Sequence, residues 1–100
     1  MPGSPGTLAH VRVSAARPDP ATGPAGVRLD MPATARVRLD VIDVAGRVVR
    51  EIDAGRLASG AHDLVWDGRD REGRTSPAGI YRLRVRVGAD GSARRVVRLD

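Results

Sequence analysis

Apolar and polar residues alternate over several short stretches of the chain. In residues 27–31 and 36–41, Val, Leu or Met occupies every second position, and Arg or Asp occupies the positions between. Side chains two residues apart lie on one face of a β-strand, so each stretch predicts a strand with one buried and one solvated face. The pattern is clearest in residues 80–87, where the polar face consists of arginines.

Further stretches of this kind follow one another, separated by turns that contain Gly and Pro. We place strands at residues 8–15, 27–31, 35–42, 47–52, 61–67, 80–87 and 93–99, and loops at 17–24, 53–59 and 88–92, the last with Asp90-Gly91 at its tip. About seven short strands without helical periodicity predict an all-β fold, an immunoglobulin-like (fibronectin III-like) antiparallel β-sandwich. We expect a single domain over residues 8–100, preceded by a flexible linker over residues 1–7.

The stretch 60–81 holds the one Trp and the one Tyr of the chain, on either side of a polar turn. We assign Trp66 to the core, and we expect the Tyr81 hydroxyl to bond the backbone of residues 76–79, as a tyrosine at this corner of a β-sandwich does. Aspartates in the turns accept backbone N–H bonds, and glycines supply a positive φ. The residues assigned to the core and turns are Asp43, Gly46, Trp66, Asp67, Gly68, Gly73, Gly79 and Tyr81.

Composition limits the chemistry of the chain. Cys and Phe are absent, so there is no disulfide or thiolate site, and the core is built from small branched side chains and one indole. The net charge of +5 comes from 17 arginines, with no lysine, interleaved with 12 acidic residues. Because the arginines are spread along the chain, we interpret most of them as solvated strand faces and expect no specific nucleic-acid binding. No apolar run is long enough for a transmembrane segment.

Two ligand sites in the stretch 60–81 are less favoured than structural explanations. Asp67, Asp70 and Glu72 lack the alternate spacing of a calcium loop and lie among arginines. A turn held by Asp–backbone hydrogen bonds explains them better. Trp66 could stack on a sugar, but a single ring on an inward face is typical of a core. We therefore expect no metal and no cofactor.

Catalysis is also not indicated. His62 and Asp63 are the residues that resemble part of a hydrolytic triad, together with Ser59 or Ser76. Neighbouring residues on a strand point to opposite faces, so His62 and Asp63 cannot readily pair. We interpret His62 as a partly buried ring on the same face as Trp66.

Six motifs occur in an order that resembles a known family. They are Pro18 and Pro20; Met31 and Pro32; Asp43, Gly46 and Arg47; Gly60, His62, Trp66, Asp67 and Gly68; Gly79 and Tyr81; and the closing stretch Arg95 to Leu99. The order resembles the bacterial FlgD-type immunoglobulin-like domain, and it is similar to the C-terminal sorting domain of proteins exported by type IX secretion. This chain departs from the family in having no aromatic residue in Pro18-Asp19-Pro20 and in having Ile42 where the family often has an aromatic residue.

The resemblance implies a non-catalytic, C-terminal module of a larger secreted or surface bacterial protein, acting in export sorting, anchoring or assembly. The export signal would lie on a longer precursor. The partners would be the export or assembly machinery or the rest of the parent protein, and the isolated domain would be monomeric. In type IX substrates the closing strand is recognised, and the corresponding residues here are Arg94, Arg95, Val96, Val97, Arg98 and Leu99. A structural scaffold of the flagellar hook-cap type is an alternative.

A binding module is the rival from another class. The predicted outward faces of two strands carry arginines that could together bind a surface polyanion or an acidic glycan. These residues are Arg36, Arg38, Arg82, Arg84 and Arg86. With two aromatic residues in the chain, such a face has no platform for stacking bases.

Overall fold

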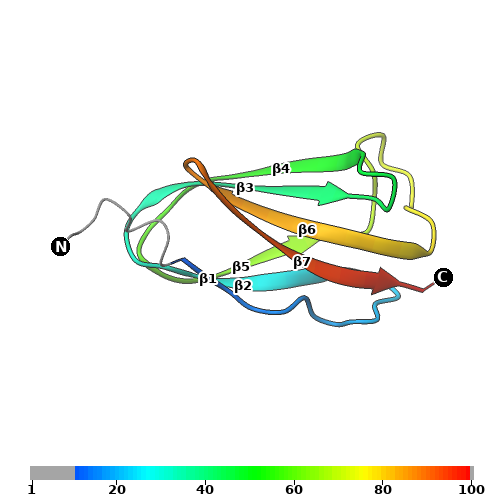
Figure 1. Cartoon of the computed structure of the whole chain (residues 1–100), viewed down its shortest axis with the longest axis horizontal. Helices are drawn as coiled ribbons and strands as arrows, with labels where there is room; N and C mark the ends of the chain where they lie inside the picture. Colours follow the sequence, from blue (N-terminus) through cyan, green and yellow to red (C-terminus); the bar gives the residue numbers. More distant parts are fainter. Residues whose placement is uncertain (1–10, 100) are drawn as a thin grey trace.

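The computed structural model describes residues 11–99, and within them the chain forms seven strands and no helix (Figure 1). The strands are β1 (Arg12–Val13), β2 (Ala25–Met31), β3 (Ala35–Ile42), β4 (Val48–Leu57), β5 (Gly60–Trp66), β6 (Gly79–Val87) and β7 (Asp90–Arg98). All strand pairs are antiparallel, and they form a three-stranded sheet of order β1-β2-β5 and a four-stranded sheet of order β4-β3-β6-β7. The predicted immunoglobulin-like sandwich is confirmed.

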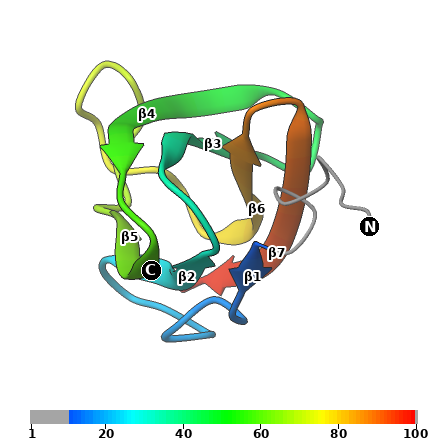
Figure 2. The same ribbon diagram turned by 90° about the vertical axis from the view of Figure 1, so that its left-hand side faces the viewer.

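Strand β4 decides which variant of the sandwich this is. In the constant-type immunoglobulin arrangement the fourth strand joins the first sheet, beside the fifth. Here β4 pairs with β3 instead, with Leu39 opposite Ile52, and so lies in the four-stranded sheet. Viewed along the long axis, the two sheets lie on opposite sides of the interior (Figure 2). This three-on-four arrangement agrees with the fibronectin III-like form expected from the sequence.

The core lies between the sheets and follows the alternation of the sequence. In β3, every second residue is fully buried and the arginines between are exposed. The buried apolar residues are Ala16, Ala21, Ala25, Val27, Leu29, Met31, Val37, Leu39, Val41, Leu64, Trp66, Tyr81, Leu83, Val85, Val87 and Val96. Aliphatic side chains dominate this set because the chain has no Phe, and so Trp66 is its largest member.

Two predicted boundaries are wrong because backbone irregularities interrupt the alternation. Of the first strand, expected at 8–15, residues 8–10 lie outside the described part of the chain, and within that part the strand covers Arg12–Val13 and ends before residue 14. Beyond it, pairing with β2 continues only at separate points, where Ser14 N donates to Arg28 O and Arg17 exchanges two bonds with Gly26. The predicted loop 53–59 is instead largely strand, because β4 runs on to Leu57 through a register shift with Gly55 at a φ of 75°.

The hairpin between β6 and β7 also differs from the prediction. Asp90-Gly91 does not form the tip, since Asp90 already pairs with Val87. The tip is Gly88-Ala89, and Gly88 has a φ of 60°. Glycine at the first central position of a two-residue loop is typical of a type II′ turn, which matches the twist of the two strands.

One end of the sandwich gathers several loops. The β3–β4 turn, the segment between β5 and β6, and the end of β7 lie together at the right of Figure 1. Hydrogen bonds join these segments to neighbouring strands, for example from Arg71 N to Val49 O at 2.9 Å. The loop 17–24 reaches the same end, where Ala21 N donates to Val97 O and Leu99 N donates to Ala21 O, both at 2.8 Å. The loop thus covers part of the edge of β7, which would otherwise be an open sheet edge.

Gly26 provides a test of the packing between β2 and β5. A Cβ at this position would collide with the carbonyl oxygen of Leu64 on the neighbouring strand. We therefore expect Gly26→Ala to lower the free energy of unfolding by about 1–3 kcal/mol, measured by urea denaturation. Gly23→Ala is the matched control, because nothing lies within 4 Å of a Cβ at Gly23. Equal stability of the two variants would contradict the close approach of the strands.

Candidate functional surfaces

Trp66 stands at the end of β5 with its side chain completely buried. Its ring lies 5.1 Å from the Tyr81 ring at an interplanar angle of 56°, a tilted arrangement that aromatic pairs favour. Its Nε1 donates a hydrogen bond of 2.8 Å to Arg69 O, which satisfies the buried indole donor. A ring enclosed in this way has no face available to a sugar.

Tyr81 fixes the corner between the two sheets. Its hydroxyl donates a hydrogen bond of 2.7 Å to Pro77 O, within the segment 76–79 that the sequence indicated. Burial raises the pKa of Tyr81 above its ordinary value, so the hydroxyl stays protonated and remains a donor. The bond anchors the polypeptide that enters β6.

Arg98, in the closing strand, is buried beside the same rings, with 5% of its surface exposed. Its guanidinium carbon lies 5.3 Å from the centroid of the Trp66 ring, and Nη1 donates to Gly23 O at 3.0 Å. Gly68 makes room for it, because a Cβ at Gly68 would collide with this guanidinium. The sequence grouped Arg98 with the sorting strand, but on the folded domain a partner cannot reach its side chain.

Arg98→Ala tests this structural role. We expect the substitution to lower the free energy of unfolding by about 2–4 kcal/mol, since it leaves a cavity beside Trp66 and removes a charged hydrogen bond. Arg95→Ala, on the exposed side of the same strand, should change it by less than about 0.5 kcal/mol. Thermal and urea unfolding of both variants would check this, and an Arg98→Ala domain as stable as the parent would refute the buried role.

Two turns of identical sequence pattern, Asp-x-x-Gly-Arg, have the same structure. Asp43 Oδ1 accepts bonds from the N–H groups of Ala45 and Arg47, at 3.0 and 2.9 Å. Asp70 Oδ1 accepts the equivalent bonds from residues 72 and 74, at 2.9 and 3.0 Å. The turn glycines have φ values of 86° and 85°. Sequence reasoning predicted a turn held by aspartate–backbone hydrogen bonds at both places, but it did not note that DVAGR is repeated as DREGR.

The loop after β5 is also held by Asp67. Its Oδ1 accepts hydrogen bonds from Arg69 N at 3.0 Å and from Arg50 Nη1 at 2.9 Å, and the second of these connects the loop to β4. With Asp67 and Asp70 engaged by N–H donors and guanidinium groups, their carboxylates do not converge as calcium ligands do. Within residues 11–99, no three His, Asp or Glu side chains are grouped so that they could hold a metal.

The two turns make folding stability depend on acid pH. The pKa of Asp43 is lowered chiefly by the backbone N–H of Arg47, and that of Asp70 chiefly by the backbone N–H of Arg74. A carboxyl group whose pKa falls on folding stabilises the fold above its unfolded pKa, about 3.9 for Asp, and this stabilisation is lost as the pH falls through the folded pKa.

We therefore expect the melting temperature to fall between about pH 5 and about pH 2, and to fall less steeply in the Asp43→Asn, Asp70→Asn double variant. Asp90→Asn is the control, because the Asp90 side chain makes no hydrogen bond or ion pair to the described residues. A double variant with the same pH dependence as the parent would show that other carboxylates cause the effect.

The closing strand β7 divides its side chains between the two faces of its sheet. Val96 and Arg98 are buried, and Arg94 is half-buried, with Nη2 donating to Val13 O of β1 at 2.9 Å. Arg95, Val97 and Leu99 alternate with them and lie on the outer face. Of the residues predicted as a sorting strand, Arg95 and Leu99 are exposed and Val97 is half-buried on the outer face, whereas Val96 and Arg98 are closed to a partner.

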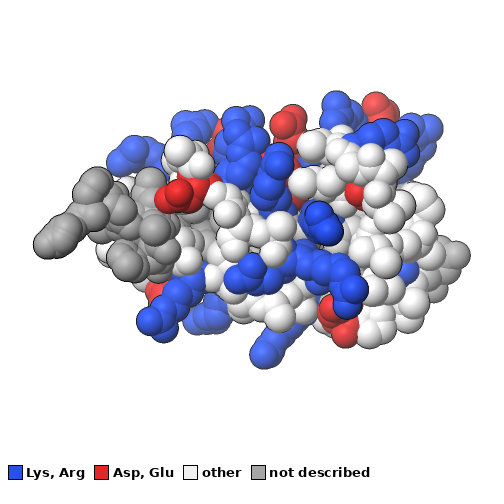
Figure 3. All heavy atoms as spheres, in the orientation of Figure 1, with Lys and Arg blue, Asp and Glu red and all other residues white. Residues whose placement is uncertain are grey.

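The arginine face lies on the outside of the four-stranded sheet, but much of its charge is neutralised. Arg84 and Arg86 both donate to Asp40 Oδ2, at 2.8 and 3.0 Å, and Arg36 pairs with Asp53 at 2.6 Å. On the face of the molecule shown in Figure 3, basic groups are distributed along its length rather than gathered in one place. Arg38 and Arg82 remain without an acidic partner among the described residues.

Asp40 is the residue on this face that the sequence did not single out. The alternation places it outward, as expected, yet it is only 1% exposed because the two guanidinium groups cover it. Burial is the largest influence on its pKa and raises it, but the hydrogen bonds from Arg84 and Arg86 and their charges outweigh burial, so the pKa of Asp40 lies below its ordinary value. The carboxylate is thus ionised and holds the two arginines in place.

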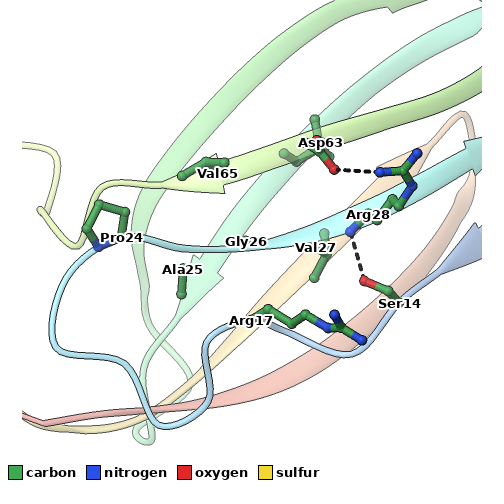
Figure 4. Close-up of a pocket in the computed structure, with 10 residues that line it drawn as sticks. Ser14, Arg17, Pro24, Ala25, Gly26, Val27, Arg28, Asp63 and Val65 are labelled. Carbon is green, nitrogen blue, oxygen red and sulfur yellow. Dashed lines mark hydrogen bonds and ion pairs between the residues drawn. The ribbon is translucent and has the colours of Figure 1, made fainter.

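A groove of about 480 Å³ crosses the outer face of the three-stranded sheet (Figure 4). Gly26 and Val65 are among the residues that line it. Near one end, Arg28 and Asp63 form an exposed ion pair of 3.7 Å, and Arg28 N donates to Ser14 Oγ at 2.8 Å. The groove is open and its polar groups largely satisfy one another, so it shows no sign of a specific ligand.

The residues considered for catalysis do not converge. His62 Nε2 lies 2.7 Å from Ala58 O, and Asp63 projects to the opposite face of β5, where it pairs with Arg28. Ser76 is buried, and its hydroxyl has no bonded partner among the described residues.

In residues 11–99 there is no helix with the length and apolar character needed to cross a membrane.

The three-on-four sandwich, the Tyr81 corner and the Asp-Gly turns define an immunoglobulin-like module whose polar motifs serve the fold. The sequence profile of the FlgD Ig-like domain matches residues 14–91, and the chain belongs to this family. Among curated proteins, the basal-body rod modification protein FlgD of Salmonella typhimurium is 38% identical over 71 residues, which are 71% of this chain and 30% of that protein. The chain therefore spans about a third of the length of these relatives.

Solved structures agree with this assignment. FlgD from P. aeruginosa has a TM-score of 0.63 at 26% identity, with 86% of this chain and 70% of that chain covered. Latent PorU from Porphyromonas gingivalis has a TM-score of 0.72 at 18% identity, covering 89% of this chain and 9% of PorU. PorZ, described as a surface component of the type IX secretion system of the same organism, has a TM-score of 0.56 at 21% identity. The PorU and PorZ similarities establish the fold alone.

Proposed function

We propose that this domain is a non-catalytic module of a larger bacterial protein at or outside the cell surface, and that it acts in the assembly, anchoring or export sorting of that protein. The observation that carries the proposal is the family assignment over residues 14–91. The placement of the polar motifs supports it, because the Asp, Gly, Trp and Tyr residues that attract attention in the sequence serve turns and core.

Assembly is favoured within this proposal. The FlgD proteins of Salmonella typhimurium and P. aeruginosa are relatives above 25% identity. A further FlgD structure of this fold, from Xanthomonas campestris, is described as giving insights into hook capping essential for flagellar assembly. Export sorting is supported more weakly, by likeness of fold to PorU and PorZ. In both cases the domain would be a structural part of a parent protein and would bind other proteins rather than a substrate.

A deletion cannot test the role of the closing strand, because removing residues 94–100 would take Val96 and Arg98 out of the core. The better variant in the full-length parent protein is Arg95→Ser, Val97→Ser, Leu99→Ser, which changes only outward side chains. We expect about a tenfold drop in the tagged parent protein recovered in the extracellular or assembled fraction of its native cells, with total protein unchanged. Control substitutions Arg12→Ser and Arg17→Ser on the other sheet should leave recovery unchanged.

Removal of the whole domain is the decisive companion experiment. If the parent protein lacking residues 11–99 is exported and assembled at the parental level, the domain has no role in either process. Unchanged recovery of the triple variant, with a strong effect of the domain deletion, would place the recognition surface elsewhere on the module.

Binding of a surface polyanion is the second candidate function. The specific observation in its favour is that Arg38 and Arg86 lie directly opposite each other, as do Arg82 and Arg95. Like charges in such positions repel each other, and a bound anion would relieve the repulsion. Against it stands the engagement of Arg36, Arg84 and Arg86 by carboxylates of the same sheet.

A further inference from the structure

A small patch at the end of the four-stranded sheet combines charge with exposed aliphatic groups. It consists of Ile80, Arg82, Arg95, Val97 and Leu99, from β6 and from β7 with the residue that follows it, and is called the β6–β7 patch below. Ile80 pairs across the strands with Val97, and Arg82 pairs with Arg95. The alternation of β7 places Leu99 on the same face.

The aliphatic part of the patch is unusually exposed. Ile80 is 42% exposed and Leu99 is 46% exposed. Within the described chain, exposed large apolar side chains are few, namely Val44, Val65, Ile80 and Leu99. Two of these four adjoin one another through Val97, and clustered exposure of this kind indicates contact with another molecule more than scattered exposure does.

The charged part of the patch has no counterion in its own sheet. The strand neighbours of Arg82 are Ile42 on β3 and Arg95 on β7, so no carboxylate lies directly beside it. Arg84, two residues further along, is the contrasting case, because it faces Asp40 and bonds to it. Arg82 and Arg95 are both exposed, and neither makes a side-chain hydrogen bond or ion pair within residues 11–99.

We propose that the β6–β7 patch is a docking surface for a protein segment that carries acidic and aliphatic side chains together. Carboxylates of the segment pair with Arg82 and Arg95, and its aliphatic groups cover Ile80, Val97 and Leu99. Arginine is enriched in protein interfaces, and the buried centre of an interface is more apolar than the rest of the protein surface. This inference rests on the proposed function, for which it names the contact surface and the chemistry of the partner.

A protein segment fits the patch better than a phosphate or sulfate polymer. A polyanion is held by charge, and it would gain nothing from three aliphatic side chains beside the arginines. Trp66 and Tyr81 are both buried, so the patch offers no ring for stacking bases or sugars. The two ligand classes therefore differ in whether the aliphatic residues contribute to affinity.

The test is a titration of the ¹⁵N-labelled domain with defined probes, followed by amide chemical shifts. One probe is a short peptide of alternating Glu and Leu, the second has Ser in place of Leu, and the third is heparin. We expect the Glu/Leu peptide to shift amides of residues 80–82 and 95–99 and to bind about tenfold more tightly than the Glu/Ser peptide. Ile80→Ser, Leu99→Ser should remove that difference.

Charge is tested by Arg82→Ser, Arg95→Ser, which should weaken binding of the Glu/Leu peptide about tenfold. Arg12→Ser, Arg17→Ser is the matched control, since it removes the same charge from the other sheet and should have almost no effect. Thermal unfolding of each variant checks that the fold is intact, as expected for exposed positions.

Equal affinity for the Glu/Leu and Glu/Ser peptides, with heparin bound at the same residues, would overturn the inference in favour of a polyanion site. Absence of shifts at the patch on addition of the Glu/Leu peptide would overturn it outright. The export and assembly experiment is independent of this titration. Loss of assembly in the triple variant without peptide binding would leave the proposed function standing and remove only the stated partner chemistry. If the peptide binds but deletion of the domain leaves assembly unchanged, the proposed function is wrong and the stated partner chemistry stands.

Discussion

The packing of one indole holds the two sheets of this domain together. Trp66 belongs to β5 of the three-stranded sheet, and its neighbours Tyr81 and Arg98 belong to β6 and β7 of the other. The chain has no Phe, and among the described residues Trp66 is the largest fully buried side chain. The buried guanidinium extends this cluster to the loop 17–24 through Gly23 O, so four distant segments depend on the same ring.

The turns at one end of the molecule follow from this constraint. Trp66 is the last residue of β5, and its Nε1 bonds to Arg69 O, so the loop must turn back immediately over the ring. Asp67 and Asp70 stabilise that reversal by accepting backbone N–H groups. Gly68 is required where the chain passes over Arg98, since any side chain there would displace the guanidinium. The conspicuous polar motif of the sequence is therefore a consequence of burying Trp66.

The sequence predicted the elements that depend on local alternation and local hydrogen bonds. Period-two patterning predicted the succession of seven strands along the chain and the burial of Val37, Leu39 and Val41. A known corner motif predicted the bond of Tyr81 to residue 77. The sequence did not predict the extension of β4 past Ile52 to Leu57, because a register shift breaks the alternation there. The hairpin tip was misplaced because Asp-Gly is the stronger turn signal, although Gly88 met the geometric need.

Candidate surfaces were harder to predict from the sequence, because neighbours on other strands decide whether an arginine is buried, paired with a carboxylate or exposed.

Sequence reasoning placed Arg95 and Arg98 in one sorting strand, yet Arg98 is inside the core and Arg95 is in solvent. Arg82 and Arg84 look equivalent, but only Arg84 faces a carboxylate. The alternation along a strand assigns each arginine to one face of the sheet. It does not show which arginines lie beside a carboxylate such as that of Asp40. The arginines available for recognition are thus those that are neither buried in the core nor paired with a carboxylate of the domain.

The inward and outward side chains of β7 differ in how freely they can be substituted, and this difference affects how such a domain can change its partner. Inward residues of β7 are constrained by Trp66 and by the contact with β1, so they cannot vary without loss of stability. Outward residues share the same backbone and are exposed or half-buried, and we expect their substitution to leave the fold intact. A strand built in this way can alter recognition through every second residue while the register that closes the sandwich stays fixed.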